Sequence, residues 1–254
     1  MSLRLHGVPL SQPFRSVAWA LLQKRLPFEV KMAVPGSTRK GGTGSPDFLA
    51  MNPTGNVPFM EDGEVRISEG PAILAHLCQK NGWSDLYPYA EASPLKAKVD
   101  EYCHWHHSNT RLLAPAYFAP LARPDMATEP AQLASHRSRG TRALELLESA
   151  WLADSSFIGG ADHMTIADLI AYEEVGQIGP KFMNLVCFDP YPNIRAWVGK
   201  MEQAPYHDEA HAALTALGDL SAFEPGDKEL GKRIGAASKA GFGALAASQP
   251  AAKL

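Results

Sequence analysis

The chain has 254 residues, a length that indicates one or two domains. Hydrophobic residues make up 45% of it and charged residues 20%, which allows a sizeable core and excludes wholesale disorder. The formal net charge of −3 gives no general attraction to nucleic acid or anionic lipid. No apolar run approaches the ~20 residues that cross a bilayer, and the N-terminus lacks the apolar stretch of a secretory signal. These properties favour a soluble globular protein.

Three cysteines, Cys78, Cys103 and Cys187, are spread along the chain without a CxxC motif. An odd and sparse set of this kind argues against a disulfide framework and suits a reducing compartment. We therefore expect a cytoplasmic protein.

The first eighty residues predict a small module of strands and helices in the order β-α-β-α-β-β-α. Short runs with period-two alternation are typical of half-buried strands, and Asp62-Gly63 between two of them indicates a hairpin. Pro13 favours the first turn of a helix, and the glycine-rich residues 35–47 predict a loop. The expected strands are 3–6, 28–34, 57–60 and 65–67, and the expected helices include those that begin near Pro13 and Glu69.

The remainder of the chain predicts helices. Glycine and proline mark a linker, and no convincing strand follows it. The last part is dominated by alanine, glycine and serine without a large apolar face, which predicts a mobile tail. The expected divisions are a first domain at 1–82, a linker at 83–93, an all-helical domain at 94–220 and a flexible tail at 221–254. The expected helical stretches are approximately 92–120, 130–153, 165–178, 190–204 and 206–217.

A capping box marks the start of one of these helices. Thr165 can accept a hydrogen bond from the backbone of Asp168, and Asp168 can reach back to the N–H of Thr165. Met164 and Leu169 flank the pair as a hydrophobic staple. We predict that this box serves folding rather than chemistry.

Five sequence motifs, taken in their order and spacing, together indicate one protein family. They are Ser11-Gln12-Pro13, Asn52-Pro53-x-Gly55-Asn56-Val57-Pro58, Glu69-Gly70-Pro71-Ala72-Ile73, Phe157-Ile158-Gly159-Gly160 leading to Thr165-Ile166-Ala167-Asp168, and Val99-Asp100-Glu101-Tyr102 with Trp105-His106-His107 and Arg111. With them the chain resembles the cytosolic glutathione transferase family over about residues 3–217, and in particular its theta class and bacterial relatives. The resemblance implies an α+β fold, in which a thioredoxin-like domain precedes an all-α domain.

The resemblance implies a catalytic role for Ser11. The nucleophile in glutathione transfer is the thiolate, because the thiol reacts poorly near neutral pH. A hydroxyl can donate a hydrogen bond to the sulfur anion, and a helix N-terminus adds positive partial charge and free N–H groups. The alternative role of Ser11 is an ordinary N-cap. No tyrosine precedes Tyr87 and no cysteine precedes Cys78, which excludes the tyrosine-dependent and cysteine-dependent classes at this position.

Val57-Pro58 resembles the family's turn with a cis peptide bond before proline. The cis form costs only about 0.5–1 kcal/mol more than trans, and in the family it lets the backbone at Val57 pair with the cysteinyl part of glutathione. The alternative is an ordinary trans proline that opens an edge strand.

The same resemblance implies further contacts with glutathione. Glu69 would bind the γ-glutamyl ammonium group, and the backbone N–H of Gly70 would receive the γ-glutamyl carboxylate. Gln12 and Asn56 belong to the matching motifs and are further candidates for binding glutathione.

Three departures from the family pattern remove side chains expected near glutathione. Gly70 stands where the family has serine or threonine, and Asn56 and Thr43-Gly44 stand where theta proteins often have lysine and His-Lys. We therefore expect weaker binding of glutathione, and so a higher KM. Arg39 and Lys40, in the glycine-rich loop, are candidates to compensate, and their alternative role is a solvated pair of charges.

Trp105, His106 and Arg111 lie on the first expected helix of the second domain, where the family builds its electrophile site. A purely structural role stays open for these residues, above all for Trp105. His104 and His107 have the i, i+3 spacing of metal ligands on a helix, but no third ligand is evident. We therefore expect no metal.

The resemblance thus implies a glutathione S-transferase that conjugates glutathione, its cosubstrate, to small electrophiles or reduces peroxides, and that forms the family's usual homodimer. The alternatives are a glutathione-dependent disulfide reductase, a non-catalytic glutathione-binding or ligand-binding protein, and an interaction module on the same fold. The final Ala252-Lys253-Leu254 resembles the Ser-Lys-Leu peroxisomal signal, so a peroxisomal location is the alternative to a cytoplasmic one.

Overall fold

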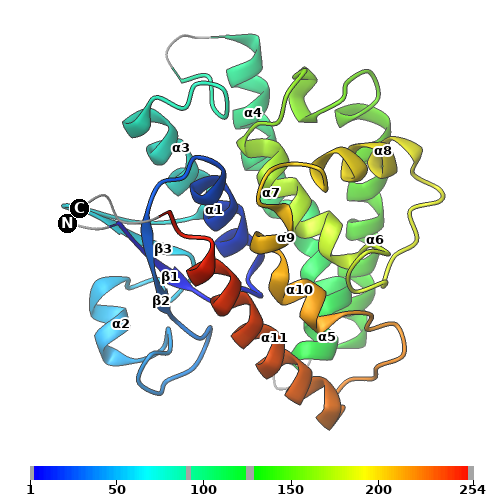
Figure 1. Cartoon of the computed structure of the whole chain (residues 1–254). Coiled ribbons are helices and arrows are strands. Elements are labelled where there is room, and N and C mark those ends of the chain that lie inside the picture. The colour runs from blue at the N-terminus through cyan, green and yellow to red at the C-terminus, as the bar shows by residue number, and fades with distance from the viewer. Residues whose placement is uncertain (1–2, 90–92, 124–128, 251–254) are drawn as a thin grey trace.

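The computed structural model describes residues 3–89, 93–123 and 129–250. Within these ranges an N-terminal half, built from one sheet and its helices, precedes a half that is entirely helical (Figure 1). The predicted α+β arrangement, with a thioredoxin-like half followed by a helical half, is confirmed.

The described part of the chain forms a four-stranded sheet with the strand order β2-β1-β3-β4. β2 runs parallel to β1, whereas β3 runs antiparallel to both β1 and β4. The predicted Asp62-Gly63 hairpin is present, and Gly63 adopts a φ of 66° in its tight loop, a conformation that glycine takes at little cost. The strands are β1 (Leu3–Gly7), β2 (Phe28–Met32), β3 (Phe59–Asp62) and β4 (Val65–Ser68).

Alternation along the strands divides the sheet into two buried faces. Leu5 and Met60 belong to the main core, on the face covered by α1 (Gln12–Gln23) and α3 (Gly70–Asn81). Phe59 instead joins a smaller cluster with Phe48 of α2 (Pro46–Met51). Because neighbouring residues of a strand point to opposite faces, a single short strand such as β3 contributes to both clusters.

The helical half begins at Pro94, and its first segment is not one continuous helix. α4 ends at Trp105, short 3-10 turns follow at His106–Ser108 and Thr110–Leu112, and Asn109 between them is non-helical. The Asn109 side-chain amide donates to the Trp105 carbonyl (2.8 Å), so a local side-chain bond replaces a helical one. The longer helix expected over 92–120 is therefore broken at this point.

The helices of this half up to residue 217 are shorter than expected but lie in or next to the predicted stretches. No helix in the described ranges is both long and apolar enough to cross a membrane. The helices are α4 (Pro94–Trp105), α5 (Ala119–Ala122), α6 (Pro130–Leu146), α7 (Ile166–Val175), α8 (Pro192–Met201), α9 (His207–Ala210) and α10 (Ala212–Leu217).

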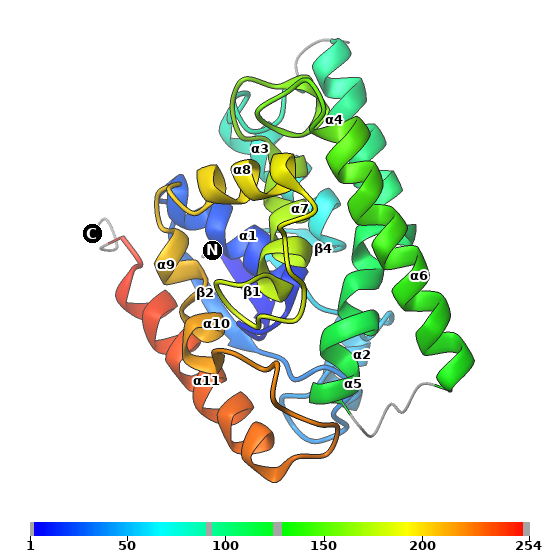
Figure 2. The ribbon, with the colours of Figure 1, turned by 90° about the vertical axis from the view of Figure 1, so that its right-hand side faces the viewer.

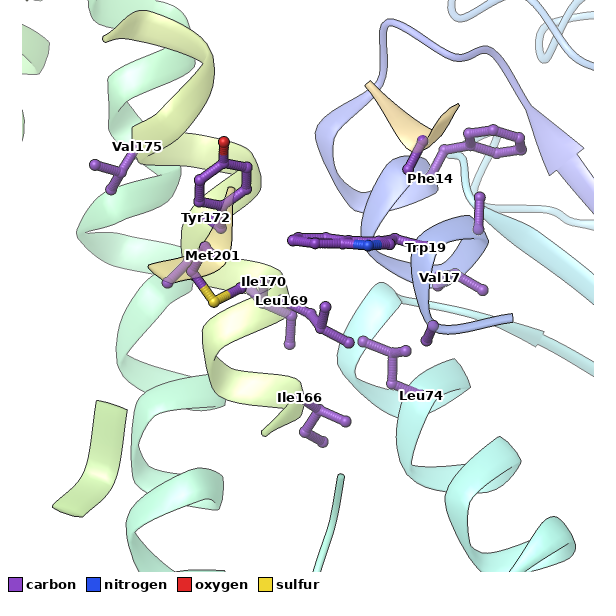
Figure 3. Packing of buried hydrophobic residues seen from close by; sticks show 14 of the residues in the cluster. Phe14, Val17, Trp19, Leu74, Ile166, Leu169, Ile170, Tyr172, Val175 and Met201 are labelled. Atoms are coloured by element: carbon purple, nitrogen blue, oxygen red, sulfur yellow. The ribbon is translucent and has the colours of Figure 1, made fainter. Parts of the chain in front are cut away.

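The two halves share one core rather than meeting at a polar surface. Figure 3 shows Phe14, Val17 and Trp19 of α1 on one side and Leu169 and Tyr172 of α7 on the other. The Trp19 ring is wholly buried, and its Nε1 donates across the halves to the Pro205 carbonyl (2.8 Å). The apolar faces of α1 and α7 therefore hold the two halves together.

A buried ionic group also crosses between the halves. Arg15 of α1 is fully buried, and its Nε donates to Glu173 Oε2 of α7 (2.5 Å). His211 contacts the other Glu173 oxygen (3.0 Å), and Gln177 Oε1 accepts from Arg15 (3.1 Å). Burial alone would raise the pKa of Glu173, but Arg15 and His211 hold that pKa below its ordinary value.

The predicted capping box at the start of α7 is present. The Thr165 hydroxyl accepts from the backbone of Ala167, and the Asp168 carboxylate accepts from the N–H of Thr165 (2.9 Å). Both side chains are fully buried, so the box lies inside the helical half and serves its packing.

The expectation of a flexible tail over 221–254 is wrong for most of that segment. Residues Lys228–Ala247 form a helix, α11, capped by Asp227, that lies along α10 and reaches the edge strand β2 (Figures 1 and 2). Leu230, Ala237, Gly241 and Leu245 line its buried face. Ala237 and Gly241 in the middle of that face allow close approach, and only Leu230 and Leu245 are large, so hydrophobicity alone did not reveal it. The tripeptide Ala252-Lys253-Leu254 lies outside the described residues.

Candidate functional site

The turn between β1 and α1 places Ser11 at the start of a helix. The Ser11 N–H donates to the Val8 carbonyl (2.9 Å), and the Arg15 N–H donates to the Ser11 carbonyl (3.0 Å) as a first bond of α1. The Ser11 hydroxyl makes no hydrogen bond to any described residue, although Ser11 is the N-cap residue of α1. The hydroxyl is therefore available to a ligand beside the positive end of a 12-residue helix.

A second turn, which contains Val57 and Pro58, presents open backbone groups. The Val57–Pro58 peptide bond is cis, as predicted. The Asn52 side chain, which is buried, donates to the Asn56 carbonyl (2.9 Å) and so fixes the turn from below. The N–H and C=O of Val57 make no hydrogen bond within the described part of the chain. An extended peptide can therefore pair with the backbone at this position.

The third element is the start of α3, where the backbone adopts an unusual conformation. Glu69 has a φ of 73°, which non-glycine residues rarely adopt and which costs on the order of 1–3 kcal/mol. Its carboxylate is exposed and has no partner among the described residues. Gly70 is buried, and a Cβ added to it would lie 3.4 Å from the Cβ of Pro13. The N-termini of α1 and α3 therefore meet at Pro13 and Gly70.

These three elements and the broken end of α4 enclose a cleft of about 210 Å³. Ser11 lies two residues before Pro13, which forms one wall. The lining residues are Pro13, Asn56, Val57, Pro58, Glu69, Gly70, Pro71, His106, His107 and Arg111. The structure thus brings together seven of the predicted site residues, five expected to contact glutathione and two expected to contact the electrophile.

The break at Asn109 sets the helical wall of this cleft. His106 is only 4% exposed, and its Nδ1 is buried without a partner among the described residues. Burial, together with the neighbouring His107 and Arg111, lowers the pKa of His106 to about 3. His106 is therefore a neutral imidazole at physiological pH, and it offers a ligand a hydrogen bond without bringing a charge.

Arg111 is the cation of the cleft, and it rests on a buried carboxylate. Its Nη1 donates to Glu174 Oε1 of α7 (2.8 Å), and the side chains of Arg111 and Glu174 are 39% and 2% exposed. The second oxygen, Oε2, is buried and has no partner in the described residues. Burial raises the pKa of Glu174, and Arg111 opposes that rise. Arg111 therefore favours the ionised form of Glu174 against the effect of its burial.

This interaction gives a testable result for Arg111→Ala. The variant should lose about 2 kcal/mol of stability, because Glu174 is left buried without its cation. Its folded-state pKa then rises further above the unfolded value, so the folded state holds a proton that the unfolded state releases. Stability therefore falls as pH increases, and the loss measured by urea unfolding should be larger at pH 8 than at pH 5.

Arg142→Ala is the matched control. Arg142 pairs with Glu145 on the surface of α6, with both side chains more than half exposed. Removing this pair should cost less than about 1 kcal/mol at either pH. A loss for Arg111→Ala that is equally small, or equal at pH 5 and pH 8, would contradict the role of Arg111 in holding Glu174.

Five predicted site residues do not line the cleft, and one of them is Ser11, which lies two residues before the wall residue Pro13. Gln12 is buried in the first turn of α1, and Arg39 and Lys40 are exposed in the glycine-rich loop. Trp105 packs its ring against Trp151 and Tyr102, with centroids 5.5 and 5.6 Å away. Trp105 thus stands in aromatic packing between helices, which corrects its expected place on the cleft wall.

A neighbouring cleft of about 350 Å³ shares Glu69, Pro71 and His107 with the first and also includes His104. Residues 3–89, 93–123 and 129–250 contain no group of three His, Cys, Asp or Glu side chains that could hold a metal ion. His104 and His107 therefore stand without a third ligand in the described structure.

Two residues of the site were not predicted. His107 lines both clefts, and its signal in the sequence was a place in the theta-like motif. Glu174 had no signal of its own, because it lies in an apolar helical stretch beside a second glutamate and its link to Arg111 spans 63 residues. Only packing of α7 against the end of α4 reveals that link.

Comparisons with known proteins agree with this geometry. Residues 5–84 match the family model described as the glutathione S-transferase N-terminal domain. Glutathione S-transferase theta-1 of Bos taurus is 30% identical over 238 residues, which cover 89% of this chain and 94% of the relative. Human glutathione S-transferase theta-2 is 30% identical over 225 residues, which cover 85% and 88%.

Solved structures show the same similarity in three dimensions. A human theta-class glutathione transferase in complex with the glutathione conjugate of 1-menaphthyl sulfate has a TM-score of 0.72 at 26% identity, covering 94% of this chain and 99% of that one. Human glutathione S-transferase T1-1 in its apo form has a TM-score of 0.69 at 26% identity, covering 98% and 100%. Because curated relatives at 30% identity span nearly the whole chain, the chain belongs to the glutathione S-transferase family and is a glutathione transferase that resembles the theta class.

Proposed function

We propose that this protein conjugates glutathione to small carbon electrophiles, and that the Ser11 hydroxyl stabilises the glutathione thiolate. The observation that supports this most is the unbonded Ser11 hydroxyl at the positive end of α1, next to the cleft. A human theta-class relative has been solved with a glutathione conjugate, which supports the same cosubstrate here.

The proposed reaction needs little from the protein beyond positioning and charge. The thiol loses its proton to solvent, and the sulfur anion accepts a hydrogen bond from Ser11 and the field of α1. The sulfur then attacks the electrophilic carbon, forming the S–C bond while the leaving group departs with its electron pair. Neutral His106 and the Arg111 cation lie on the wall that faces this step.

The glutathione peptide would lie across the two turns of the N-terminal half. Its cysteinyl backbone would pair with the free N–H and C=O of Val57. The Glu69 carboxylate would receive the γ-glutamyl ammonium group, and the N–H of Gly70 would receive the carboxylate. In this arrangement the sulfur points toward the start of α1.

Glutathione should bind less tightly here than a full set of family contacts would allow. Asn56 offers no charge to the glycyl carboxylate. Thr43 is buried, and its hydroxyl accepts from the N–H of Gly36 (2.9 Å), so it already has a partner. Arg39 and Lys40 remain our candidates for compensating cations, which they would supply through movement of the exposed loop.

Gly70→Ser should restore a missing contact. The cleft has room for the new Cβ, since its nearest neighbour would lie at an ordinary van der Waals distance of 3.4 Å. The added hydroxyl would donate to the γ-glutamyl carboxylate, and a hydrogen bond to a charged group contributes about 1.5–3 kcal/mol. We expect the glutathione KM to fall by about tenfold with little change in kcat.

Gly70→Ala is the control, because it adds the same Cβ without a hydroxyl. Its KM should stay close to that of the parent protein. If serine and alanine give the same KM, measured by initial rates at varied glutathione concentration, the carboxylate is not bound at Gly70.

The experiment that tests the proposed function combines calorimetry with a panel of electrophiles. Glutathione binding together with turnover of haloalkanes or aryl halides supports it. Binding without turnover of any electrophile or peroxide would indicate a ligand-binding protein. Turnover only of glutathione mixed disulfides would indicate a reductase, and a stoichiometric protein partner without glutathione affinity would indicate an interaction module. A homodimer and a cytoplasmic location remain predictions, which light scattering and a fluorescent fusion would check.

A further inference from the structure

The C-terminal helix α11 touches the turn that presents Ser11. Gly241, on the buried face of α11, lies against Pro9 of that turn and Ala213 of α10. A Cβ added to Gly241 would lie 2.5 Å from the Cβ of Pro9 and 2.8 Å from the Cβ of Ala213. Real Cβ atoms do not approach other carbons this closely, so α11 can occupy this seat only with glycine at this position.

The turn is held from its other side by the buried Arg15. The Pro9 carbonyl accepts from Arg15 Nη1 (3.1 Å). Arg15 is itself fixed by Glu173 and Gln177 of the helical half. The segment from Pro9 to Ser11 therefore lies between an immobile guanidinium group and the α11 helix.

Hydrogen bonds near both ends of α11 hold the helix in place. Arg233, near its start, donates to the Leu217 and Asp219 carbonyls (3.4 Å each). Just beyond its end, Gln249 Oε1 accepts from the N–H of Phe28, the first residue of β2 (3.2 Å). The helix thus spans from the end of α10 to the sheet edge (Figure 1), with Gly241 between its two attachments.

We propose that α11 is a positioning element for the thiolate site: by packing on Pro9 through Gly241, it fixes the turn that orients the Ser11 hydroxyl. This inference rests on the proposed role of Ser11. It assigns α11 a function in thiol activation, separate from any contact with the electrophile. A misplacement of about 1 Å in a catalytic group can reduce the rate by as much as 10²-fold, so a forced shift of the turn should be measurable.

The test compares Gly241→Ala with Gly243→Ala in the full-length chain. Both changes place alanine in α11, where it favours the helix over glycine by about 0.5–1 kcal/mol, so both variants should fold. A Cβ at Gly243 would meet no described atom within 4 Å. The pair therefore differs in the contact with Pro9 and Ala213.

The measured quantities are the pKa of the thiol in bound glutathione, followed through thiolate ultraviolet absorbance against pH, and kcat/KM. Gly241→Ala should raise the bound-thiol pKa by about one unit and lower kcat/KM by about tenfold. Gly243→Ala should leave both quantities at their parent values. That combination supports the proposal.

A lower melting temperature for Gly241→Ala with an unchanged thiol pKa would overturn the proposal, because a merely structural helix would give this result. The result for Ser11→Ala distinguishes failure of the proposed role of α11 from failure of the proposed role of Ser11. If Ser11→Ala raises the thiol pKa and Gly241→Ala does not, only the role of α11 fails. If neither variant changes it, the serine assignment and the role of α11 both fail.

Discussion

Ser11→Ala is expected to lower kcat/KM for glutathione conjugation by about 10²–10³-fold, the usual result of removing one preorganised donor from a catalytic anion. The pKa of the bound thiol should rise, because the thiolate loses its hydrogen bond while the thiol loses almost nothing. Some activity should persist, since the N-terminus of α1 still provides its dipole and free N–H groups. The Kd for glutathione, measured by calorimetry, should change little because the peptide contacts remain.

Two companion variants make this result specific. Ser11→Thr keeps a hydroxyl and should retain most of the activity. Ser16→Ala removes a hydroxyl from the next turn of α1, where it donates to the Pro13 carbonyl (3.0 Å), and should cost only stability, on the order of 1 kcal/mol. Activity of Ser11→Ala equal to that of the parent protein across the electrophile panel would refute the assignment.

Asp168→Asn should produce the largest loss of stability, about 3–5 kcal/mol. One oxygen of the fully buried Asp168 accepts from the Ile158 N–H (2.8 Å) and from Trp197 Nε1 (2.9 Å). The other accepts from the N–H and the hydroxyl of Thr165 (2.9 and 3.0 Å). An asparagine can serve only one pair of donors and turns its own N–H groups toward the other, and each lost bond to a charged group costs about 1.5–3 kcal/mol.

The four hydrogen-bond donors surround a charged carboxylate at Asp168. Burial raises the pKa of Asp168 to about 6, although the four donors oppose the rise, so the group is ionised at neutral pH. The predicted loss is a large part of the 5–15 kcal/mol typical of folded proteins. It should appear as a lower urea midpoint with an unchanged m-value.

Asp227→Asn is the matched control for this measurement. Asp227 also caps a helix, accepting from the Glu229 N–H (2.7 Å), but it is exposed at the start of α11. Asparagine and aspartate are nearly equal as N-caps, so this variant should match the parent protein. Similar midpoints for both variants would show that the buried donors do not need the second oxygen.

Local signals were sufficient to predict most of the N-terminal half. The alternating strands, the Asp62-Gly63 hairpin and Pro13 each depend on a few neighbouring residues, and each is present, although β3 begins at Phe59 instead of residue 57 and β2 ends at Met32 instead of residue 34. The capping box at Thr165 and Asp168 is equally local. The Trp197 and Ile158 partners of Asp168 could not be predicted, because they depend on how α8 and the 158–160 turn pack against α7.

Seven of the predicted site residues lie together in the structure, whereas Trp105, which was predicted from its place on a helix, lies in aromatic packing. Motif residues from Asn56 to Gly70 meet in one cleft because the fold places the starts of α1 and α3 together. Trp105 was misplaced, because its place on α4 did not reveal that its ring packs against Trp151, a residue distant in the sequence. His106 lies in the short turn before the break at Asn109 and Arg111 in the one after it, and both line the cleft.

The α11 helix shows why composition alone misled. Two of the four residues on its buried face are Ala237 and Gly241, where a packed helix usually has leucine or valine, so its hydropathy resembles that of a disordered segment. In α11 the small size of the residue is what allows the helix to pack, because the place that Gly241 occupies has no room for a methyl group.

The buried Arg15 restricts how the two halves of the enzyme can move. Its partners beyond the β1–α1 turn, Glu173 and Gln177, belong to the helical half. If the two halves opened as a hinge, the Arg15 guanidinium and the Glu173 carboxylate would lose each other in a low-dielectric interior. Such a change costs several kcal/mol. Rigid-body opening is therefore rare at working temperature. We therefore expect substrates to enter and products to leave through local fluctuations of loops and side chains at the mouth of the cleft.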